Sequence, residues 1–561
     1  MTNILKTPVL IVGGGPVGLC LALDLAWRGI ECLLIERTDG AIHHPKTASL
    51  THRTMEFCRR WGIGNRIRHC GFPLDYGLSM VFCTNMVGDS LTSIPYPSLQ
   101  DEEQLPQTPE RKQRAPQLYF DPILADEARL RDGITLRYHC ELVSHTQDVQ
   151  GVNAVARDPR NGETVNIQAR YMVACDGAGS SVRKSLGITM QGDSVLDHSM
   201  AIFLRCPGLL KLHDKGEAER YIFVGPSGTW GNLTVVDGNE LWRLTVLGFK
   251  SKEETENFDA DWWVRRCLGS DEIAFEVIDV LPWRRSRLVA ERYSQGRVFL
   301  AGDAAHTMSP TGGFGFNTGL GDAVDLGWKL EGVLKGWGGT ELLTSYDTER
   351  RPIGWRNVTA SAENYFKLTS ASDCTSILDQ TPEGDATRER IGRYMLEATR
   401  MEWENLGVTL GYRYVDSPIC MPDDAPAPPD ERSVYIPTSH PGHRAPHAWL
   451  SEGKSTLDLF GKNFVLLRFS GAPQATAFAE TADELGLPLQ VVDIDDDAIA
   501  QLYERKLVLV RPDGHCVWRS DQMPFSVSKI LNRIRGQLAF NGQQESEESG
   551  AHSGYEGTEV S

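Results

Sequence analysis

The chain has 561 residues, 41% of them hydrophobic and 24% charged, as in globular proteins, and this length predicts about three or four domains. Its formal net charge of −18 argues against nucleic acid and anionic membrane surfaces as partners, because both are negatively charged. The 12 cysteines show no C-x-x-C pair and no metal-ligand spacing, and neither a signal peptide nor a membrane span is predicted, so we expect a cytoplasmic protein.

Residues 7–37 predict a strand, a glycine-rich turn, a helix and a second strand that ends at Glu36. The turn has the G-x-G-x-x-G spacing: Gly13 suits a tight turn, Gly15 the close approach of a pyrophosphate, and Gly18 helix–strand contact. The helix N-terminus offers free N–H groups to phosphates, and a carboxylate at position 36 can accept hydrogen bonds from a ribose. All these parts occur in order, which predicts a dinucleotide site.

The next part of the chain alternates between helical and extended patterns. Helical spacing occurs over 51–58 and 117–131, while a polar, proline-rich segment at about 84–116 predicts surface loops. Residues 134–173 alternate in the manner of strands, and the last of these strands leads into Asp176–Gly177.

Residues 190–285 change to short alternating runs separated by turns, which predicts an antiparallel sheet inserted into the first domain. The aromatic residues of this sheet are candidates for the wall of a flat apolar pocket. Residues 296–334 then predict a strand, an acidic turn, a glycine loop and a long helix, and 341–405 predict further helices. A linker rich in Pro and Asp, 421–432, precedes a last α/β domain.

The return of the chain to its first domain favours a tightly held flavin over the cofactor of a simple dehydrogenase. Asp303 is placed to hydrogen-bond a ribityl hydroxyl, and a helix starting near Asn317 would direct its positive end toward the pyrimidine side of a flavin. Backbone could lie against a ring system at the glycines of the loop between them: Gly312, Gly313 and Gly315.

Three motifs occur in this order: GGGPVG at 13–18, CDGAGSSVR at 175–183 and GDAAHTMSPTGGFGFNTG at 302–319. With them the chain resembles the single-component FAD-dependent aromatic hydroxylases, the group of para-hydroxybenzoate hydroxylase and phenol hydroxylase. The resemblance covers about 1–370 and continues more loosely beyond it, where LVRPDGHCVWR (509–519) is similar to the phenol and 2,4-dichlorophenol hydroxylase branch.

The resemblance implies an α/β fold with a Rossmann-type FAD-binding domain like that of para-hydroxybenzoate hydroxylase, an inserted antiparallel substrate sheet and a C-terminal thioredoxin-like domain. The expected division is a first FAD-binding part at 1–189, the sheet at 190–285, a second FAD-binding part at 286–370, a helical segment and linker at 371–430, the thioredoxin-like domain without C-x-x-C at 431–540, and a disordered acidic tail at 541–561.

The same resemblance implies which residues hold FAD. Gly13, Gly15 and Gly18 would bind the pyrophosphate, Glu36 the adenosine ribose and Asp303 the ribityl chain. Lys46 stands where many relatives have an arginine, and Asp176 and Arg183 belong to a motif linked to both FAD and the nicotinamide cofactor. The further expected FAD contacts are Pro16, Val17, Arg37, Gln117, Pro310, Gly312, Gly313, Gly315 and Asn317.

The implied reaction uses NAD(P)H to reduce FAD, O2 to form a flavin hydroperoxide, and that hydroperoxide to hydroxylate a phenolic substrate. The partners would be a small aromatic molecule and O2, in a homodimer or a higher homo-oligomer. The phenol hydroxylase branch uses an aspartate to activate the substrate, but that position is Ala48 here. His52 is a candidate base or a cap residue, and Tyr221 and Arg243 are further candidates.

Because the aspartate is missing, the substrate is either already anionic or larger than phenol. Three other activities remain open on the same scaffold: Baeyer–Villiger oxygen insertion, hydroxylation of a polyketide or antibiotic, and a non-catalytic flavin-binding role. Assays of which aromatic compounds accelerate NAD(P)H oxidation, and of the products formed, separate these alternatives.

Overall fold

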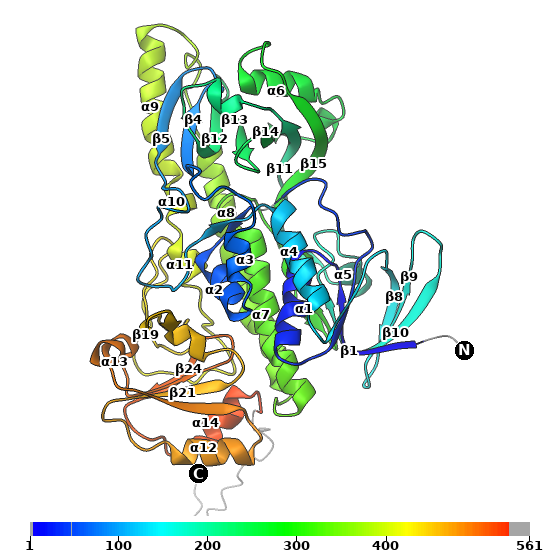
Figure 1. Ribbon diagram of the computed structural model, residues 1–561, viewed down its shortest axis with the longest axis vertical. Helices are drawn as coiled ribbons and strands as arrows, with labels where there is room; N and C mark the ends of the chain where they lie inside the picture. The colour runs from blue at the N-terminus through cyan, green and yellow to red at the C-terminus, as the bar shows by residue number, and fades with distance from the viewer. Residues whose placement is uncertain (1–3, 47, 538–561) are drawn as a thin grey trace, which may run out of the picture.

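The computed structural model describes residues 4–46 and 48–537, and its three sheet-containing parts follow one another along the long axis of the molecule (Figure 1). An eight-stranded sheet lies in the middle, a second eight-stranded sheet at one end, and a four-stranded sheet at the other end. We call these parts the nucleotide domain, the upper sheet and the C-terminal domain. The tail predicted to be disordered, 541–561, lies outside the described residues.

The nucleotide domain is built around β1 (Ile4–Val12), which pairs in parallel with β2 (Cys32–Ile35) on one side and β10 (Thr164–Ala174) on the other. Its last four residues, Val9–Val12, are all buried. A parallel strand flanked on both sides and covered on both faces needs a continuous apolar run, which this sequence has. The other strands of the sheet are β7 (Ile134–Arg137), β8 (Glu141–Gln147), β9 (Val152–Arg157), β16 (Ser294–Gln295) and β17 (Val298–Leu300).

Helices α1 (Pro16–Trp27), α4 (Gln117–Leu130) and α7 (Phe314–Lys335) share one buried cluster with this sheet. The chain therefore returns to its first sheet and then enters α7, as the sequence predicts. Shorter elements complete the domain: β3 (Ser49–Leu50), α2 (His52–Arg60), α3 (Gly64–Arg68), β6 (Gln113–Arg114) and α5 (Ser181–Ser185).

The upper sheet corrects the prediction of a purely antiparallel, wholly inserted sheet. Its strand order is β18 (His306–Thr307), β15 (Glu276–Ala290), β11 (Met190–Arg205), β14 (Leu241–Phe249), β13 (Gly228–Val235), β12 (Ala218–Gly225), β4 (Ser79–Cys83) and β5 (Ser90–Ile94). β4 and β5 come from the first part of the chain, and β4 pairs with β12 in parallel. This addition covers an edge of β12 whose N–H and C=O groups would otherwise lack partners.

Two further boundaries differ from the prediction. The proline-rich segment expected to form only loops contains β5 and β6, and the boundary expected at 285 falls inside β15. Both errors have the same origin, because short strands paired with residues far away in the sequence carry little local signal.

The two faces of the upper sheet have different roles. Several of its aromatic residues gather on the face covered by α6 (Ala260–Leu268), where Phe223 stacks on Trp230 with ring centroids 5.0 Å apart. The opposite face carries polar residues such as Arg243, which reaches toward the nucleotide domain. The expectation that aromatic side chains wall the substrate pocket is therefore wrong for the cluster under α6, which is ordinary core.

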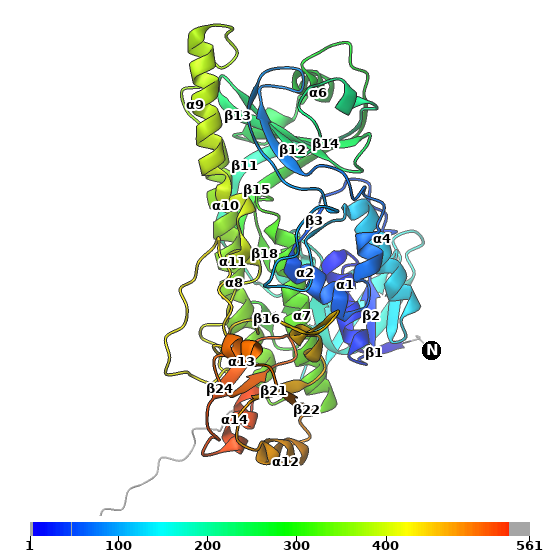
Figure 2. The ribbon, with the colours of Figure 1, turned by 60° about the vertical axis from the view of Figure 1, so that its left-hand side comes forward.

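Helices connect the three parts along one side of the molecule (Figure 2). The long helix α8 (Glu341–Thr369) packs on α7 and on β15, and α9 (Pro382–Ala398) packs on β5. Two short helices follow, α10 (Arg400–Trp403) and α11 (Leu406–Thr409). Across residues 4–46 and 48–537, no helix combines the length and the apolar character that a membrane crossing requires.

The C-terminal domain has the sheet order β22-β21-β23-β24. β21 and β22 are parallel, and the other neighbouring pairs are antiparallel. Its elements are β19 (Trp449–Ser451), β20 (Lys454–Ser455), β21 (Phe464–Phe469), α12 (Thr476–Glu484), β22 (Leu489–Ile494), α13 (Asp497–Tyr503), β23 (Leu507–Val510), β24 (Cys516–Ser520) and α14 (Val527–Ile534).

Candidate flavin site

The turn after β1 leaves no room for side chains at two of its glycines. Gly13 has a φ of 110°, and a Cβ there would lie 2.4 Å from the carbonyl oxygen of Cys175. A Cβ on Gly18 would lie 2.1 Å from the carbonyl oxygen of Gly13, so α1 sits directly on the turn. A Cβ on Gly302 would lie 3.0 Å from the Val17 side chain. The first and third motifs therefore pack directly against each other.

The third glycine faces open space. A Cβ on Gly15 would meet no atom within 4 Å, and Gly15 is the N-cap of α1, with Pro16 as the first helical residue and no side chain capping the helix. The first N–H groups of α1 are therefore available at an open helix N-terminus, which is the arrangement that binds a pyrophosphate. This geometry fits FAD.

Glu36 stands beside the same turn, at the end of β2. One carboxylate oxygen accepts a hydrogen bond from the Gly14 N–H at 2.7 Å, and the other accepts one from the Thr38 N–H at 2.9 Å. Arg37 follows it and is exposed. The carboxylate is thus held at the rim of the turn, where it can also accept from a ribose hydroxyl.

A second group of candidate residues converges from three distant segments. The Lys46 N–H donates to the side-chain oxygen of Gln117 at 3.0 Å, at the start of α4. Asp303, from the acidic turn, is exposed, although the surrounding protein desolvates its carboxyl enough to raise its pKa, an effect that His306 and Lys46 oppose. A hydrogen-bonding group of this kind, open yet surrounded by protein, is suited to a ribityl hydroxyl.

The glycine loop after Asp303 shapes the start of α7. Gly312 and Gly313 have φ values of 93° and 68°, which a residue with a Cβ rarely adopts. Gly313 is the N-cap of α7 without a capping side chain, so the helix presents its positive end toward this loop. Pro310 is exposed at the start of the loop, and a Cβ on Gly315 would meet only Met308, at 3.7 Å.

Asn317 lies in the first turn of α7, and its side chain is bound by other parts of the protein. Its side-chain oxygen accepts from the Thr51 N–H at 3.1 Å and from the Thr54 hydroxyl at 2.6 Å. Its amide nitrogen donates to the carbonyls of Ser49 at 3.1 Å and Gly313 at 2.7 Å. The amide is occupied by protein partners, so Asn317 ties β3 and α2 to the flavin loop.

The second motif is also used internally. One oxygen of Asp176 accepts from the Ser181 N–H at 2.8 Å and leaves the other oxygen buried without a hydrogen bond to the described residues. Arg183 is buried and donates to the carbonyls of Ala304 at 2.9 Å and Ala178 at 3.0 Å. These contacts make Arg183 a tie between the second and third motifs, with both terminal nitrogens of its guanidinium donating to protein carbonyls.

Two of the three candidate catalytic residues are badly placed for proton transfer. His52 is 8% exposed at the start of α2, and burial, with Lys112 nearby, lowers its pKa to about 4, which makes it a weak base. The cap of α2 is Thr51, not His52. Tyr221 is fully buried on the α6 face, its hydroxyl donates to the Gly216 carbonyl, and burial raises its pKa well above the usual range.

The third candidate, Arg243, does reach the flavin motifs. It donates to the carbonyls of Pro45 and Lys46, both at 2.8 Å, and its Nε is buried without a partner among the described residues. Burial and three neighbouring arginines lower its pKa to about 10. These arginines are Arg114, Arg220 and Arg285. No carboxylate in the described part of the chain forms an ion pair with Arg243.

Three acidic residues around this site carry no recognisable sequence signal. Glu402 on α10 is buried and accepts from Arg220 at 2.7 Å and from the Gly312 N–H at 3.2 Å, so it joins the flavin loop to the upper sheet. Asp322 on α7 holds His306 at 2.8 Å in the core. In the sequence, Glu402 and Asp322 are recognisable only as acidic residues in predicted helices, because their partners lie far away along the chain.

The third acidic residue, Asp279 on β15, lies 3.0 Å from Nδ1 of His44. The other ring nitrogen of His44 is buried and has no partner among the described residues. Burial lowers the pKa of His44, so the ring is neutral near pH 7 and can accept a proton. A histidine oriented by a carboxylate in this way has the geometry of a general base.

Asp121 on α4 should make stability depend on pH. It accepts a hydrogen bond from Gln117 at 2.9 Å, and burial raises its pKa from 3.8 to about 7. The folded state then holds a proton that the unfolded state releases, so stability falls as pH rises from about 4 to 7 and is constant above 7. Between pH 5 and pH 8 this loss amounts to about 3 kcal/mol.

We therefore expect Asp121→Asn to be more stable relative to wild type at pH 8 than at pH 5, by about that amount. Urea unfolding at the two pH values measures the difference. Asp126→Asn, on an exposed position of the same helix, is the control and should show the same relative stability at both pH values. A pH-independent effect of Asp121→Asn would contradict the assignment.

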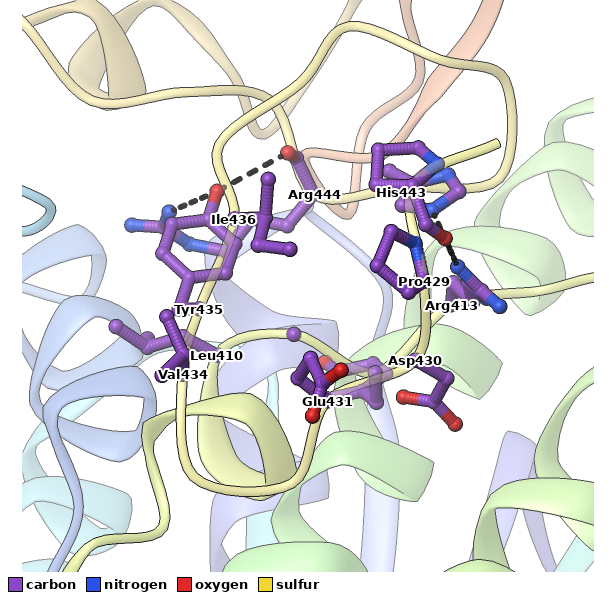
Figure 3. Close-up of a pocket in the computed structure, with 13 residues that line it drawn as sticks. Leu410, Arg413, Pro429, Asp430, Glu431, Val434, Tyr435, Ile436, His443 and Arg444 are labelled. Carbon is purple, nitrogen blue, oxygen red and sulfur yellow. Dashed lines mark hydrogen bonds between the residues drawn. The ribbon is translucent and has the colours of Figure 1, made fainter. Parts of the chain in front are cut away.

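A hollow of about 310 Å³ elsewhere on the molecule is lined by the segment that connects α11 to the C-terminal domain (Figure 3). Figure 3 shows the Tyr435 hydroxyl beside Arg444, which donates to it at 3.0 Å. None of the three glycine motifs contributes to its lining, so this hollow is separate from the flavin site.

Comparison with known proteins places these motifs in a family. A model described as "FAD binding domain" matches residues 6–361, and one described as "Aromatic-ring hydroxylase, C-terminal" matches residues 438–537. The tetracenomycin B2 monooxygenase-dioxygenase of Streptomyces olivaceus is 34% identical, over 95% of this chain and 99% of that protein. The 4-methyl-5-nitrocatechol 5-monooxygenase of a Burkholderia species is 34% identical, over 92% of this chain and 94% of that protein. The 2,4-dichlorophenol 6-monooxygenase of Delftia acidovorans is 29% identical, over 94% of this chain and 99% of that protein.

Solved structures agree with this assignment. The rebeccamycin biosynthetic enzyme RebC with reduced flavin superposes with a TM-score of 0.89 at 37% identity, over 96% of this chain and 100% of that one. Aklavinone-11 hydroxylase with FAD and aklavinone superposes with a TM-score of 0.80 at 29% identity, over 95% of this chain and 99% of that one. FAD is thus the cofactor, and NAD(P)H is the reductant typical of these proteins. The chain belongs to the family of FAD-dependent aromatic-ring hydroxylases and is an oxidoreductase.

Proposed function

We propose that this enzyme is a monooxygenase that uses NAD(P)H and O2 to hydroxylate a phenolic aromatic substrate carrying a negative charge. The observation that carries the proposal is Arg243, a largely desolvated guanidinium without a carboxylate partner, next to the segment that also contacts Gln117. A buried charge of this kind is costly unless an opposite charge joins it. A phenolate or carboxylate on the substrate supplies that charge.

The chain's own residues would divide the work as follows. Glu36 and the N-terminus of α1 hold the adenosine and pyrophosphate groups, while Asp303 and Gln117 hold the ribityl chain. When bound, FAD supplies the redox chemistry that connects NAD(P)H oxidation to transfer of oxygen from O2. Arg243 orients the anionic ring, and His44 accepts the proton of its hydroxyl through the ring nitrogen opposite Asp279.

Product analysis with matched substrates tests this proposal. Hydroxybenzoates and their neutral amides or methyl esters are incubated with holoenzyme, NAD(P)H and O2, and the products are identified by mass and by NMR. We expect ring hydroxylation coupled to NAD(P)H oxidation for anionic compounds. An aromatic ketone is added to the same set, and an ester or lactone formed from it would instead indicate Baeyer–Villiger insertion. Holoenzyme that consumes no O2 with any phenol would support a non-catalytic scaffold.

Arg243→Gln should lower kcat/KM for anionic substrates by about 10- to 100-fold, because hydrogen bonds to charged groups are worth about 1.5–3 kcal/mol. The neutral analogues should lose far less. Arg205→Gln, on a half-exposed position of the same sheet, is the control for loss of one positive charge. Equal losses for charged and neutral substrates, at unchanged FAD content, would refute the proposed role.

The second candidate function is hydroxylation of a polyketide. Its support is the similarity to tetracenomycin B2 monooxygenase-dioxygenase and to aklavinone-11 hydroxylase, which covers nearly the whole chain in both cases. The similarity to 2,4-dichlorophenol 6-monooxygenase, at 29% identity, supports the phenol branch. The same product assay, extended to fused-ring phenols, distinguishes them by which substrates accelerate NAD(P)H oxidation.

We also infer that the C-terminal domain is thioredoxin-like. The supporting observation is its mixed sheet of order β22-β21-β23-β24, with one parallel pair at one edge and a helix between β21 and β22. The cysteines of this domain include no C-x-x-C pair, so dithiol exchange has no chemical basis here, and we propose a structural or oligomer-forming role for the domain.

A further inference from the structure

An open hollow of about 610 Å³ lies between α2 of the nucleotide domain and the C-terminal domain. Its charged lining includes Arg53, Arg59 and Arg60 from α2, with Glu56 from the same helix and Asp458 from the C-terminal domain. Basic residues therefore outnumber acidic ones in this hollow, and an acid can neutralise a further cation only if it has no partner already.

Both lining acids already have full sets of partners. Glu56 accepts from Arg53 at 2.8 Å, from Nε and Nη2 of Arg444, and from the Thr108 hydroxyl at 2.7 Å. Figure 3 shows Tyr435 beside Arg444, which keeps that arginine directed at Glu56 from the C-terminal domain. Asp458 accepts from Arg59 at 2.7 and 2.9 Å, a bidentate arrangement.

The acids behind the hollow are also engaged. Asp24 accepts from Arg28 at 2.7 Å and from the indole N–H of Trp61 at 3.0 Å. Asp513 accepts from Arg511 and from His515, at 2.8 and 3.0 Å. Asp24 and Asp513 lie close enough to act on the charge of Arg60, but neither forms an ion pair with it within the described residues.

Arg60 is the cation left over. Its guanidinium lies over the rings of Phe57 and Trp27, 5.4 and 6.0 Å from their centroids, and its Nη1 is buried without a hydrogen-bond partner in residues 4–46 and 48–537. Burial and the charge of Arg28 lower the pKa of Arg60 to about 10. Arg53, only 5% exposed, likewise has an Nε without a partner among these residues.

A second cation stands on the same aromatic ring. The ammonium of Lys462 lies 5.0 Å from the Trp27 ring centroid and forms no ion pair within the described residues. Arg60 and Lys462 thus place two positive charges around Trp27, which lines the hollow together with the arginines of α2. A pair of uncompensated cations suits a doubly charged anion.

We propose that this hollow binds a phosphate-type dianion, through the free donors of Arg60 and Arg53 and the charge of Lys462. Guanidinium groups donate to phosphate oxygens in a fixed planar geometry, which favours this ligand over a halide. The dianion joins the nucleotide domain to the C-terminal domain. Because the Thr51 N–H at the start of α2 donates to Asn317, the site also supports the helix that holds the flavin loop.

The test uses full-length holoenzyme in a buffer free of phosphate and sulfate, at constant ionic strength. Titration with inorganic phosphate, followed by calorimetry and by melting temperature, should give saturable binding and a rise in Tm. Arg60→Gln should weaken binding at least 10-fold, and Lys462→Gln should weaken it less. Arg393→Gln, on an exposed position of α9, is the matched control and should bind like wild type.

Three results would overturn the proposal: no saturable binding to wild type, unchanged affinity in both Arg60→Gln and Lys462→Gln, or equal affinity for succinate. If Arg60→Gln does not fold, Arg60→Lys and Lys462→Gln carry the comparison. A parallel titration with glycerol 3-phosphate identifies the source of the ligand. Equal affinity assigns the site to a phosphate group on a larger molecule, and weaker binding assigns it to free phosphate.

Discussion

Gly18→Ala is expected to yield protein that does not retain FAD. A Cβ at this position would lie 2.1 Å from the carbonyl oxygen of Gly13, which is backbone and cannot rotate away. The start of α1 must therefore move off the turn, and its N–H groups lose the position that binds a pyrophosphate. Overpacking of this severity costs about 3 kcal/mol or more, which corresponds to about 100-fold in affinity.

The flavin absorbance per polypeptide after gel filtration measures this effect, and titration of apoprotein with FAD gives the loss in affinity. Gly64→Ala is the control, because a Cβ there would make its nearest contact at 3.5 Å, an ordinary distance. That variant should retain FAD like wild type. Retention of FAD by Gly18→Ala with wild-type affinity would show that the turn does not carry the pyrophosphate.

Arg511→Met should produce the largest loss of stability among single substitutions outside the flavin site. Arg511 is fully buried in the C-terminal domain and donates to Asp325 on α7 at 2.9 Å, to Glu349 on α8 at 2.6 and 2.8 Å, and to Asp513 at 2.8 Å. Without it, Asp325 and Glu349 keep only Lys329 as a buried ion-pair partner in this group, and Asp513 keeps only the His515 ring. Removing one partner of a buried ion pair costs about 3–5 kcal/mol, because a charge is left without compensation.

Urea unfolding of the holoenzyme measures that loss. Arg505→Met provides the control, since this arginine lies at the surface of the same domain, 3.6 Å from Asp521. Exposed ion pairs are worth at most about 1 kcal/mol, so the control should unfold close to wild type. Because the Arg511 contacts cross between domains, the variant should also unfold in two steps as the C-terminal domain separates. A loss below about 1 kcal/mol would exclude a stabilising role for this cluster.

The same cluster explains why the sequence predicts the C-terminal domain but not its contacts with the rest of the molecule. Its strands were predictable, because NFVLLRF and KLVLVRPDG are apolar runs bounded by turn residues. Two partners of Arg511, Asp325 and Glu349, lie more than 150 residues away in the chain. Nothing in the local pattern of either segment indicates that pairing, and a buried arginine has the same sequence signal as a surface one.

The candidate catalytic residues likewise could not be identified from local sequence patterns alone. Residue type and position near the motifs favour His52 and Tyr221, but burial makes His52 a weak base, and Tyr221 lies in the core under α6. Glu402 and the pair His44–Asp279 were not identified, although they lie against that loop and its neighbouring segment. Which side chains meet at a site depends on packing between distant segments, and sequence alternation cannot supply it.

The sequence by itself determined the dinucleotide turn, the two-part nucleotide domain, the cofactor and the family, because each rests on residues adjacent in the chain and on backbone needs that only glycine meets. Only the tertiary structure decided the membership of the upper sheet, the aromatic face turned toward α6, the unpaired charges of Arg243 and Arg60, and the joint at Arg511. Charge compensation and strand pairing are properties of groups brought together by the whole fold, and their energies depend on burial that no local segment specifies.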